Sequence, residues 1–464
     1  MIKKSIYTTA VTGLSVCSLF GQQAERPNLV LFMSDDCTYY DIGCYGSSDS
    51  KTPHIDNFAA EGMLFSKAYQ ASPMSSPTRH NLMTGLWPVK TGAYPNHTSA
   101  KEGTLSIVHH LRPAGYRVAL IGKSHVEPSS VFDWDLYANT VEGGELDYDA
   151  IDAFIRECKA ENVPFCLFVM SRQPHTPWNK GDADLFDPET IQLPPFYVDI
   201  PETRKRFSAY LAEINYMDSE FGRLLTVLDK QRVKDNSAVV FLSEQGNSLP
   251  FAKWTLYESG VKSACIVRWP GVVRPNTTSD AIVEYVDIVP TFLEMAGAEP
   301  RAELDGKSFL GVLAGKEEEH KEYTFSLQTT RGIYSGSEHY GIRSVANKKY
   351  RYIVNLTPDV KFQNTESEGK LFKQWKEVAE TDPIAALITH KYQYRPAIEL
   401  YDIENDRYCL NNIAGLPENT AIIERLDKVL RQWMEECGDE GQPTEMKATE
   451  HQFRNARGQI GEIF

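Results

Sequence analysis

The chain has 464 residues, and its 42% hydrophobic and 24% charged residues are typical of a globular protein with one large domain and an addition, or with two to three domains. The formal net charge of -15 argues against nucleic acid and against an anionic membrane surface as general partners. A small anionic ligand stays compatible with this charge, because a local basic pocket can lie inside an acidic protein.

The first residues have the form of a secretory signal. Lys3 and Lys4 precede a mostly apolar stretch of about a dozen residues, which is too short for a membrane span and ends in small residues. We therefore expect residues 1–21 to be a cleaved signal peptide and the mature protein to be periplasmic, with no membrane span. A lipoprotein anchor on Cys17 is the less favoured alternative, because Val16 is bulky for the position before a lipidated cysteine.

Five short apolar runs follow, each bounded by turn residues. Continuous apolar runs, rather than alternating ones, are typical of strands that are buried on both faces of a parallel sheet. Helical patterns lie between the runs, so strand and helix alternate along the chain. The sequence therefore predicts a large α/β domain with a mostly parallel central sheet flanked by helices. The runs lie at residues 28–34, 116–122, 165–171, 238–243 and 263–269.

The pattern changes after about residue 335, where the strand candidates become short and the last helix follows them. This change predicts a smaller antiparallel sheet with a helix packed on it. We accordingly divide the mature chain into a large α/β domain over 22–335 and a smaller C-terminal α+β subdomain over 336–464. The C-terminal strand candidates lie at 340–345, 350–356 and 399–403, and the helix lies at 421–434.

Polar residues directly follow four of the five apolar runs. Ligands of open α/β sheets bind outside the carboxyl ends of the strands, so four strands would deliver these side chains to one edge of the sheet. The residues are Asp35 and Asp36 after the first run, Lys123 and His125 after the second, Gln173 and His175 after the third, and Glu244 and Gln245 after the fourth.

Four of these side chains, Asp35, Asp36, Glu244 and Gln245, offer only oxygen ligands. Oxygen donors suit Ca²⁺ or Mg²⁺, and a mixed set of carboxylates and an amide favours Ca²⁺. For either pair alone, capping of the following helix is about equally favoured, since acidic residues stabilise helix starts. The occurrence of both pairs at equivalent strand ends favours the metal site.

The other strand-end residues have ordinary alternatives. Lys123 and His125 face the same way in an extended segment, which is compatible with a shared ligand and equally with a solvated loop. His175 lies in a proline-bracketed turn, Q-P-H-T-P, where a lone histidine more often has a structural role than a chemical one.

The stretch S-P-M-S-S-P-T-R-H-N-L-M-T-G, residues 72–85, has the pattern of a capped helix. Ser76 suits the N-cap, Pro77 suits the first turn and Gly85 suits the C-terminal stop. Ser75 then projects from the helix N-terminus, where backbone N–H groups favour anions, and Arg79 lies one turn further on. These residues predict an anion site next to a hydroxyl, but no adjacent base or G-x-S-x-G elbow marks a nucleophile.

The same stretch, S-S-P-T-R followed by L-M-T-G, resembles the signature of the sulfatase family. The resemblance continues along nearly the whole chain, in R-P-N-L-V-L-F-M-S-D-D, G-Y-R-V-A-L-I-G-K-S-H, K-W-T-L-Y-E-S-G-V-K and E-L-Y-D-I-E-N-D. It implies the alkaline phosphatase/sulfatase-like fold. It also implies that Ser75, the first residue of the signature, is oxidised to Cα-formylglycine, as in serine-type bacterial sulfatases that a radical-type maturating enzyme modifies before export.

The resemblance implies one Ca²⁺ ion, held by Asp35, Asp36, Glu244, Gln245 and modified Ser75. The family usually has Asp-Asn where this chain has Glu244-Gln245. Each of these side chains is one methylene longer, so the backbone would have to lie further from the ion, which Ca²⁺ tolerates better than Mg²⁺.

The resemblance also implies roles in catalysis. Arg79 would orient the modified side chain, and Lys123 and Lys253 would bind sulfate oxygens. His125 would act on the formylglycine hydrate, and His175 would protonate the leaving group.

The substrate is less well defined by the sequence. I-G-K-S-H-V-E-P and G-I-R-S-V-A-N-K-K-Y-R-Y-I-V-N-L most resemble the N-sulfoglucosamine sulfohydrolase branch, but Q-T-T-R-G-I replaces the His-His-Glu run expected before the second segment. We therefore favour O-sulfate esters of a glycosaminoglycan, mucin or algal glycan. The alternatives are a sulfamidase acting on heparan-type saccharides, a phosphoester hydrolase of the same superfamily, and an inactive glycan-binding homologue. Candidates for the sugar pocket, for each of which packing is an equal alternative, are Arg331, His339, His97 and Trp178.

Overall fold

The computed structural model describes residues 26–298 and 303–452. The predicted signal peptide over 1–21 and the alternative anchor at Cys17 lie outside these residues. Within the described part, no helix combines the length and the apolar character that crossing a bilayer requires. The seven cysteines after Cys17 are free thiols.

Each of the five predicted apolar runs forms a strand in the middle of a nine-stranded sheet, with the order β4-β3-β5-β1-β6-β7-β2-β8 and β9 paired to β2. The strands from β4 to β6 are all parallel, whereas β7 is antiparallel to both β6 and β2. The fold class is thus confirmed as mostly parallel. The apolar pattern gave no sign of the reversed direction of β7, because β7 is buried like its neighbours. The strands are β1 (Asn28–Met33), β2 (Met63–Tyr69), β3 (Arg117–Gly122), β4 (Leu136–Ala138), β5 (Phe165–Met170), β6 (Ser237–Leu242), β7 (Lys262–Arg268), β8 (Thr277–Ser279) and β9 (Val283–Glu284).

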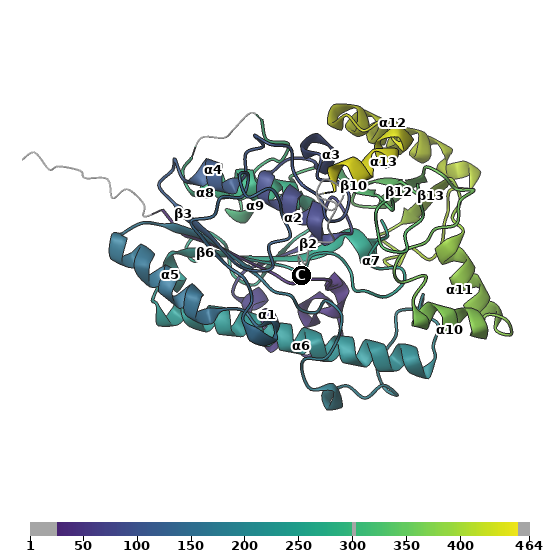
Figure 1. Ribbon diagram of the computed structural model, residues 1–464, viewed down its shortest axis with the longest axis horizontal. Helices are drawn as coiled ribbons and strands as arrows, with labels where there is room; N and C mark the ends of the chain where they lie inside the picture. Colours follow the sequence, from purple (N-terminus) through teal and green to yellow (C-terminus); the bar gives the residue numbers. More distant parts are fainter. Residues whose placement is uncertain (1–25, 299–302, 453–464) are drawn as a thin grey trace, which may run out of the picture.

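Helices cover both faces of this sheet (Figure 1). In β1, Val30 and Phe32 belong to one hydrophobic cluster, whereas Leu29, Leu31 and Met33 belong to another. Both faces of the strand are therefore buried, which explains why its apolar run is continuous. The helices on one face are α1 (Pro53–Ala60), α5 (Tyr148–Glu161) and α6 (Pro201–Lys230), and those on the other include α2 (Ser75–Thr84), α4 (Ile107–Leu111) and α8 (Ile288–Met295).

A second, antiparallel sheet of four strands lies beside the first, at the right of Figure 1. Helix α12 (Thr420–Cys437) packs on it through Leu426, Leu430 and Trp433, as the sequence predicts. The small sheet includes a strand that begins before residue 336, and the domain division at 335 stays a prediction. Its strands are β10 (Thr324–Gln328), β11 (Ile342–Ala346), β12 (Tyr350–Asn355) and β13 (Ile398–Asp402), and two further helices follow, α10 (Lys370–Val378) and α11 (Pro383–Gln393).

A buried ion pair joins the small sheet to the short helix that directly precedes β7. Arg351 of β12 places Nε 2.9 Å and Nη2 2.8 Å from Oε1 of Glu258, which begins the short helix α7 (Glu258–Val261), and both side chains are almost fully buried. Arg351→Met would leave the Glu258 carboxylate buried without its nearest cation, although Lys262 Nζ stays 3.5 Å from Oε2, so we expect the free energy of unfolding to fall by about 3–5 kcal/mol in urea titrations. Arg431→Met, which breaks an exposed pair on α12, should cost less than about 1 kcal/mol. Equal losses of unfolding free energy in Arg351→Met and Arg431→Met would contradict a special stabilising role of the buried pair.

A buried acid under the sheet makes stability depend on pH. Ser171 Oγ donates to Glu220 Oε2 at 2.6 Å, and burial raises the pKa of the Glu220 carboxyl to about 7. Between the pKa of the unfolded chain, about 4.5, and this value, only the unfolded chain releases the proton, so the free energy of unfolding falls as pH rises, by up to about 3 kcal/mol. Glu220→Gln keeps an acceptor but cannot ionise, so its stability should fall less between pH 5 and pH 8 in urea titrations. The exposed replacement Glu424→Gln should leave the slope unchanged, and an unaltered slope in Glu220→Gln would contradict the assignment.

Candidate active site

The carboxyl ends of β1 and β6 place the predicted acidic pairs next to each other. The two strands are parallel neighbours with Met33 opposite Leu242, so the residues that follow them leave the sheet at the same level. Asp36 and Glu244 have φ values of 62° and 59°. This left-handed conformation is costly for residues other than glycine and often occurs at functional sites.

Ser75 lies at the first position of α2 and faces these strand ends. Its Oγ is 2.9 Å from Asp35 Oδ1, 3.1 Å from Glu244 Oε2 and 3.5 Å from Lys123 Nζ, and it accepts a hydrogen bond of 2.9 Å from Gln245 Nε2. The side chain is only 3% exposed. The Ser75 hydroxyl is thus surrounded by two carboxylates, one amide and one ammonium group from other parts of the chain.

The helix cap predicted at Ser76 is wrong. Helix α2 begins two residues earlier, at Ser75, with Met74 in the N-cap position. The Ser76 hydroxyl instead donates to the His125 carbonyl at 3.1 Å and accepts from the Thr98 N–H at 3.3 Å, so tertiary contacts use it. The stop at Gly85 is confirmed, with φ of 66° and its N–H donating to the Asn81 carbonyl.

Three cations pair with the three carboxylates. Of these cations, Arg79 and Lys253 are buried and Lys123 is partly buried. Lys123 Nζ lies 2.6 Å from Asp35 Oδ2, and Lys253 Nζ lies 2.7 Å from Asp36 Oδ2. Arg79 Nε lies 2.9 Å from Glu244 Oε1. With all three carboxylates ionised, the charges of these six groups sum to zero, so a bound divalent cation would make the site positive and favour an anionic ligand.

The buried acids differ in their ionisation. Burial opposes ionisation of Asp35, but the charges of Lys123, His175 and Arg79 outweigh it and hold its pKa well below the usual range. Burial raises the pKa of Glu244 to about 8. A nearby cation would reverse this rise, because it stabilises the ionised carboxylate.

The oxygen-rich cluster fits a metal ion. Asp35, Asp36 and Glu244 each offer a carboxylate oxygen, and these atoms lie within 4.8 Å of one another. Gln245 Oε1 is buried and has no hydrogen-bond partner among the described residues. Turning the amide over would bring this oxygen to the position of Nε2, which now lies 2.6 Å from Asp36 Oδ1. Four oxygen donors of this kind suit Ca²⁺.

The predicted histidines lie on two sides of the cluster. His175 Nε2 is 3.6 Å from Asp36 Oδ2, and the side chain is 32% exposed. His125 Nε2 is 3.0 Å from Nδ1 of His97, which makes His97 a neighbour of His125. Burial lowers the pKa of His175 and lowers that of His125 well below its usual value, so the imidazole of His125 is neutral at neutral pH.

In the described part of the chain, the other predicted sugar-pocket residues form no hydrogen bond with the oxygen-rich cluster. Trp178 follows His175 in the loop after β5, and its Nε1 donates to the Pro174 carbonyl. Arg331 donates through Nη1 to the Glu338 carbonyl at 3.3 Å, and the His339 carbonyl accepts from Thr357 Oγ1 at 2.9 Å, so both make their hydrogen bonds within the C-terminal part of the chain.

Sequence reasoning missed three polar residues of the site. Ser248 Oγ donates to Asp36 Oδ2 at 2.8 Å, and the Tyr285 hydroxyl accepts from the Glu244 N–H at 2.9 Å. The third is Glu366, whose pKa is raised to about 7 by burial against the opposing charges of Lys253 and Arg206. Ser248 follows a recognised strand end closely, whereas Glu366 comes from a distant loop that no pattern marks.

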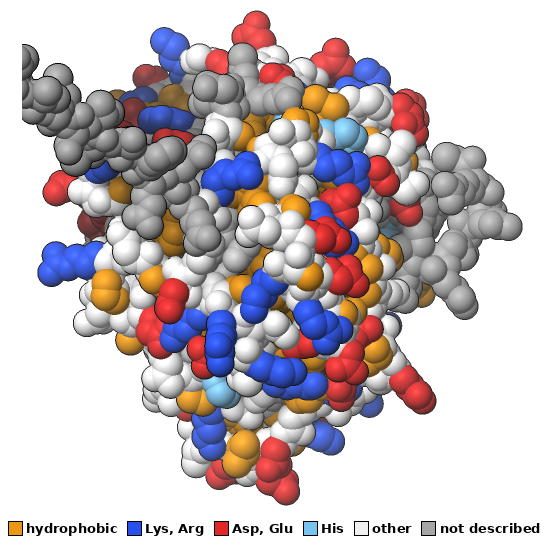
Figure 2. All heavy atoms as spheres, turned by 90° about the vertical axis from the view of Figure 1, so that its left-hand side faces the viewer, with side chains coloured by type: hydrophobic (Ala, Val, Ile, Leu, Met, Phe, Trp, Pro, Cys, Tyr) orange, Lys and Arg blue, Asp and Glu red, His pale blue; other side chains and the backbone are white. Residues whose placement is uncertain are grey.

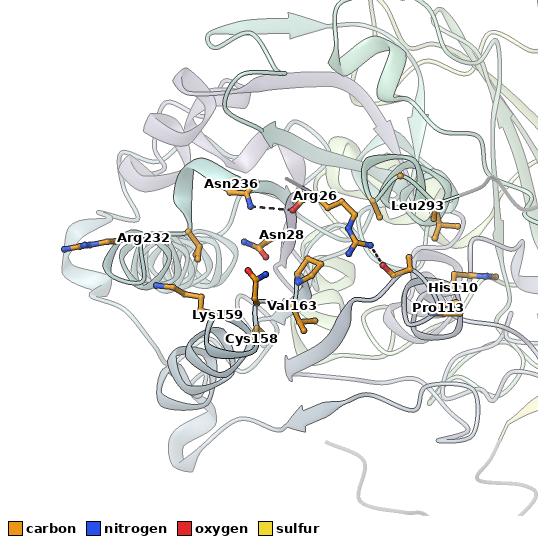
Figure 3. Close-up of a pocket in the computed structure, with 17 residues that line it drawn as sticks. Arg26, Asn28, His110, Pro113, Cys158, Lys159, Val163, Arg232, Asn236 and Leu293 are labelled. Carbon is orange, nitrogen blue, oxygen red and sulfur yellow. Dashed lines mark hydrogen bonds between the residues drawn. The ribbon is translucent and has the colours of Figure 1, made fainter. Parts of the chain in front are cut away.

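A cavity of about 1210 Å³ lies away from the candidate active site. It lies at the amino end of the strands, where Asn28 begins β1 and Asn236 precedes β6 (Figure 3). Arg26 is one of the residues that line it, and its carbonyl accepts from Asn236 Nδ2 at 3.5 Å. The face that lies at the left of Figure 1 carries interspersed basic and acidic side chains (Figure 2).

A mostly parallel sheet with an acidic cluster at its carboxyl edge, facing a hydroxyl at a helix start, defines a protein of the alkaline phosphatase superfamily. The chain matches the sulfatase family over residues 27–298 and the C-terminal family of N-sulphoglucosamine sulphohydrolase over residues 246–384. The chain therefore belongs to the sulfatase family and is a sulfuric ester hydrolase.

Relatives span most of the chain. An ulvan-active sulfatase of Formosa agariphila is 32% identical over 90% of this chain and 81% of its own length. Human N-sulphoglucosamine sulphohydrolase is 25% identical over 90% of this chain and 91% of its own. Among solved structures, a protein in complex with its substrate D-glucosamine-2-N,6-O-disulfate has a TM-score of 0.69 at 20% identity, covering 90% of this chain and 99% of the other.

Proposed function

We propose that this sulfatase hydrolyses O-sulfate esters of a sulfated carbohydrate of glycosaminoglycan, mucin or algal type. The observation that carries the proposal is the position of Ser75, the first residue of the sulfatase signature, in contact with Asp35, Glu244, Gln245 and Lys123. The similarity to an ulvan-active sulfatase and, at 23% identity over 98% of this chain and 96% of the relative, to N-acetylglucosamine-6-O-sulfatase of Bacteroides thetaiotaomicron supports a carbohydrate substrate.

Two groups would complete the site. One Ca²⁺ ion, held by Asp35, Asp36, Glu244, Gln245 and modified Ser75, would polarise the sulfate group and the nucleophile. Oxidation of Ser75 to Cα-formylglycine would supply a hydrate with one hydroxyl for attack and a second through which sulfate is expelled.

The remaining side chains would bind the substrate and move protons. Lys123 and Lys253 would bind sulfate oxygens and stabilise the negative charge that develops on them. Arg79, buried and next to Glu244, would fix the orientation of residue 75. His175 would donate a proton from Nε2 to the leaving oxygen, and His125 would accept one from residue 75 at Nδ1, the nitrogen that His97 does not occupy.

Secretion and maturation complete the proposal. Residues 1–21 would direct the chain to the periplasm, with Cys17 lipidation as the less favoured alternative. A radical-type sulfatase-maturating enzyme would oxidise Ser75 before export. Residues 22–335 would form the catalytic domain and 336–464 a smaller subdomain.

The test begins with mass spectrometry of the peptide 72–85 from the native host, which should show the aldehyde at position 75. Sulfate release is then measured on defined O- and N-sulfated saccharides, with a phosphate diester and a phosphate monoester as further arms. Release from O-sulfated sugars supports the proposal. Release from N-sulfated sugars alone would favour the second candidate, a sulfamidase, to which the match over 246–384 points. No release by fully modified protein would overturn both.

A further inference from the structure

A pocket of about 490 Å³ opens beside the candidate active site. One wall is the loop after β5, in which Thr176, Pro177 and Trp178 directly follow His175. The other wall is the first part of α6, which contributes Glu202, Lys205, Arg206 and Ala209. Since His175 lies next to Asp36, a molecule whose reacting group reaches His175 would extend into this pocket.

The indole of Trp178 is held in one orientation. Its Nε1 donates to the Pro174 carbonyl at 2.7 Å, and its ring packs against Tyr210 at a centroid distance of 5.3 Å. A fixed aromatic ring offers a large apolar contact surface and loses little entropy on binding. This surface suits the apolar face of a sugar ring.

The pocket also carries two positive charges, those of Lys205 and Arg206. The guanidinium of Arg206 lies over the Trp178 ring at 5.7 Å, and the side chain is half-buried. Neither Arg206 nor Lys205 forms an ion pair with a carboxylate of residues 26–298 or 303–452, although Glu202 also lines the pocket. Two cations against one acid make the pocket a place for an anion, and a guanidinium binds carboxylate and sulfate groups through two parallel hydrogen bonds.

The position of Glu366 links this charge to the reaction centre. The charges of Lys253 and Arg206 both oppose the rise in the pKa of the Glu366 carboxyl, so Glu366 lies within electrostatic reach of the catalytic lysine and of the pocket arginine.

We propose that this pocket is a subsite for a second sugar residue that carries its own anionic group, either a carboxylate or another sulfate, and adjoins the sulfated residue that is hydrolysed. The inference rests on the proposed function and specifies its substrate class. Trp178 would contact the ring of the second sugar, and Arg206 and Lys205 would bind its anionic group.

The test uses fully modified enzyme and three disaccharides that share the same scissile sulfated residue. The neighbouring sugar is neutral, carboxylated or sulfated. We expect kcat/KM to be higher for the two anionic neighbours and this preference to shrink as salt increases. Arg206→Gln should lower kcat/KM about 10- to 100-fold for the anionic disaccharides, the effect of one charged hydrogen bond, and less than about twofold for the neutral one.

Arg223→Gln is the matched control, because Arg223 lies on the same helix and also stacks on an aromatic ring, Tyr148, at 3.9 Å. It should change no substrate preference. A preference for only the carboxylated or only the sulfated neighbour supports the subsite and identifies its anion. Equal kcat/KM values for the three disaccharides, or an equal loss of kcat/KM on all three in Arg206→Gln, would contradict the proposed subsite but not the proposed function. No hydrolysis of any sulfated sugar would overturn both.

Discussion

Replacing Ser75 with alanine abolishes sulfate release, with an expected fall in kcat on the order of 10³-fold or more. The methyl group cannot be oxidised to an aldehyde and supplies no nucleophile. The fold should survive, because the Ser75 hydroxyl does not cap α2, whose N-cap position is Met74. Sulfate release on the preferred saccharide measures the effect, and circular dichroism confirms folding.

The matched control for this experiment is Ser72→Ala. Ser72 lies three residues upstream in the same stretch, is buried, and its Oγ has no hydrogen-bond partner among the described residues. Its removal should change kcat only a few-fold. Activity of Ser75→Ala within tenfold of the wild type would contradict the role of residue 75, as would full activity of protein whose Ser75 remains an unmodified serine.

Removing the metal should have the second largest effect. Chelation of Ca²⁺ is expected to reduce sulfate release to background and to lower the melting temperature, and added Ca²⁺ should restore both. A ligand that binds only the folded state stabilises it by about 2.7 kcal/mol at 100 times its Kd. Asp36→Asn removes one carboxylate of the cluster and keeps the size of the side chain. In this variant, added Ca²⁺ should change neither sulfate release nor the melting temperature.

Elemental analysis before and after chelation, together with thermal melts across a Ca²⁺ titration, checks this prediction. Asp229→Asn, an exposed change on α6, provides the control and should respond to Ca²⁺ as the wild type does. Undiminished turnover by protein shown to be free of metal would refute the proposed ion. Restoration by Mg²⁺ to the same level as by Ca²⁺ would refute the preference for Ca²⁺.

The sequence predicted the parts of the fold whose burial leaves a local pattern. The strands β1, β3, β5, β6 and β7 are recognisable because both of their faces are covered, which requires continuous apolar residues. The direction of β7 has no such signature. Strands β4, β8 and β9 are two or three residues long, too short to display any periodicity.

The candidate site was predictable where its residues follow strand ends. Asp35, Asp36, Glu244 and Gln245 could be grouped because parallel strands end at one edge. Arg206 and Glu366 could not, since they come from the side of a long helix and from a distant loop, and only the packing of the whole chain brings these two residues within electrostatic reach of each other. The predicted cap at Ser76 failed because a tertiary contact with His125 competed for its hydroxyl.

The burial of Ser75 determines whether this residue is accessible to another enzyme before or after the chain folds. The side chain is 3% exposed, every residue of α2 is buried, and the neighbouring loop is fastened by Gln452, whose Nε2 donates to the Asn96 carbonyl 356 positions away. In the folded protein, α2 therefore has no exposed residue to which a second protein could bind. If Ser75 is oxidised as proposed, the modifying enzyme must act on a nascent or unfolded chain, and the fraction of active molecules would then depend on the rate of oxidation relative to the rate of folding.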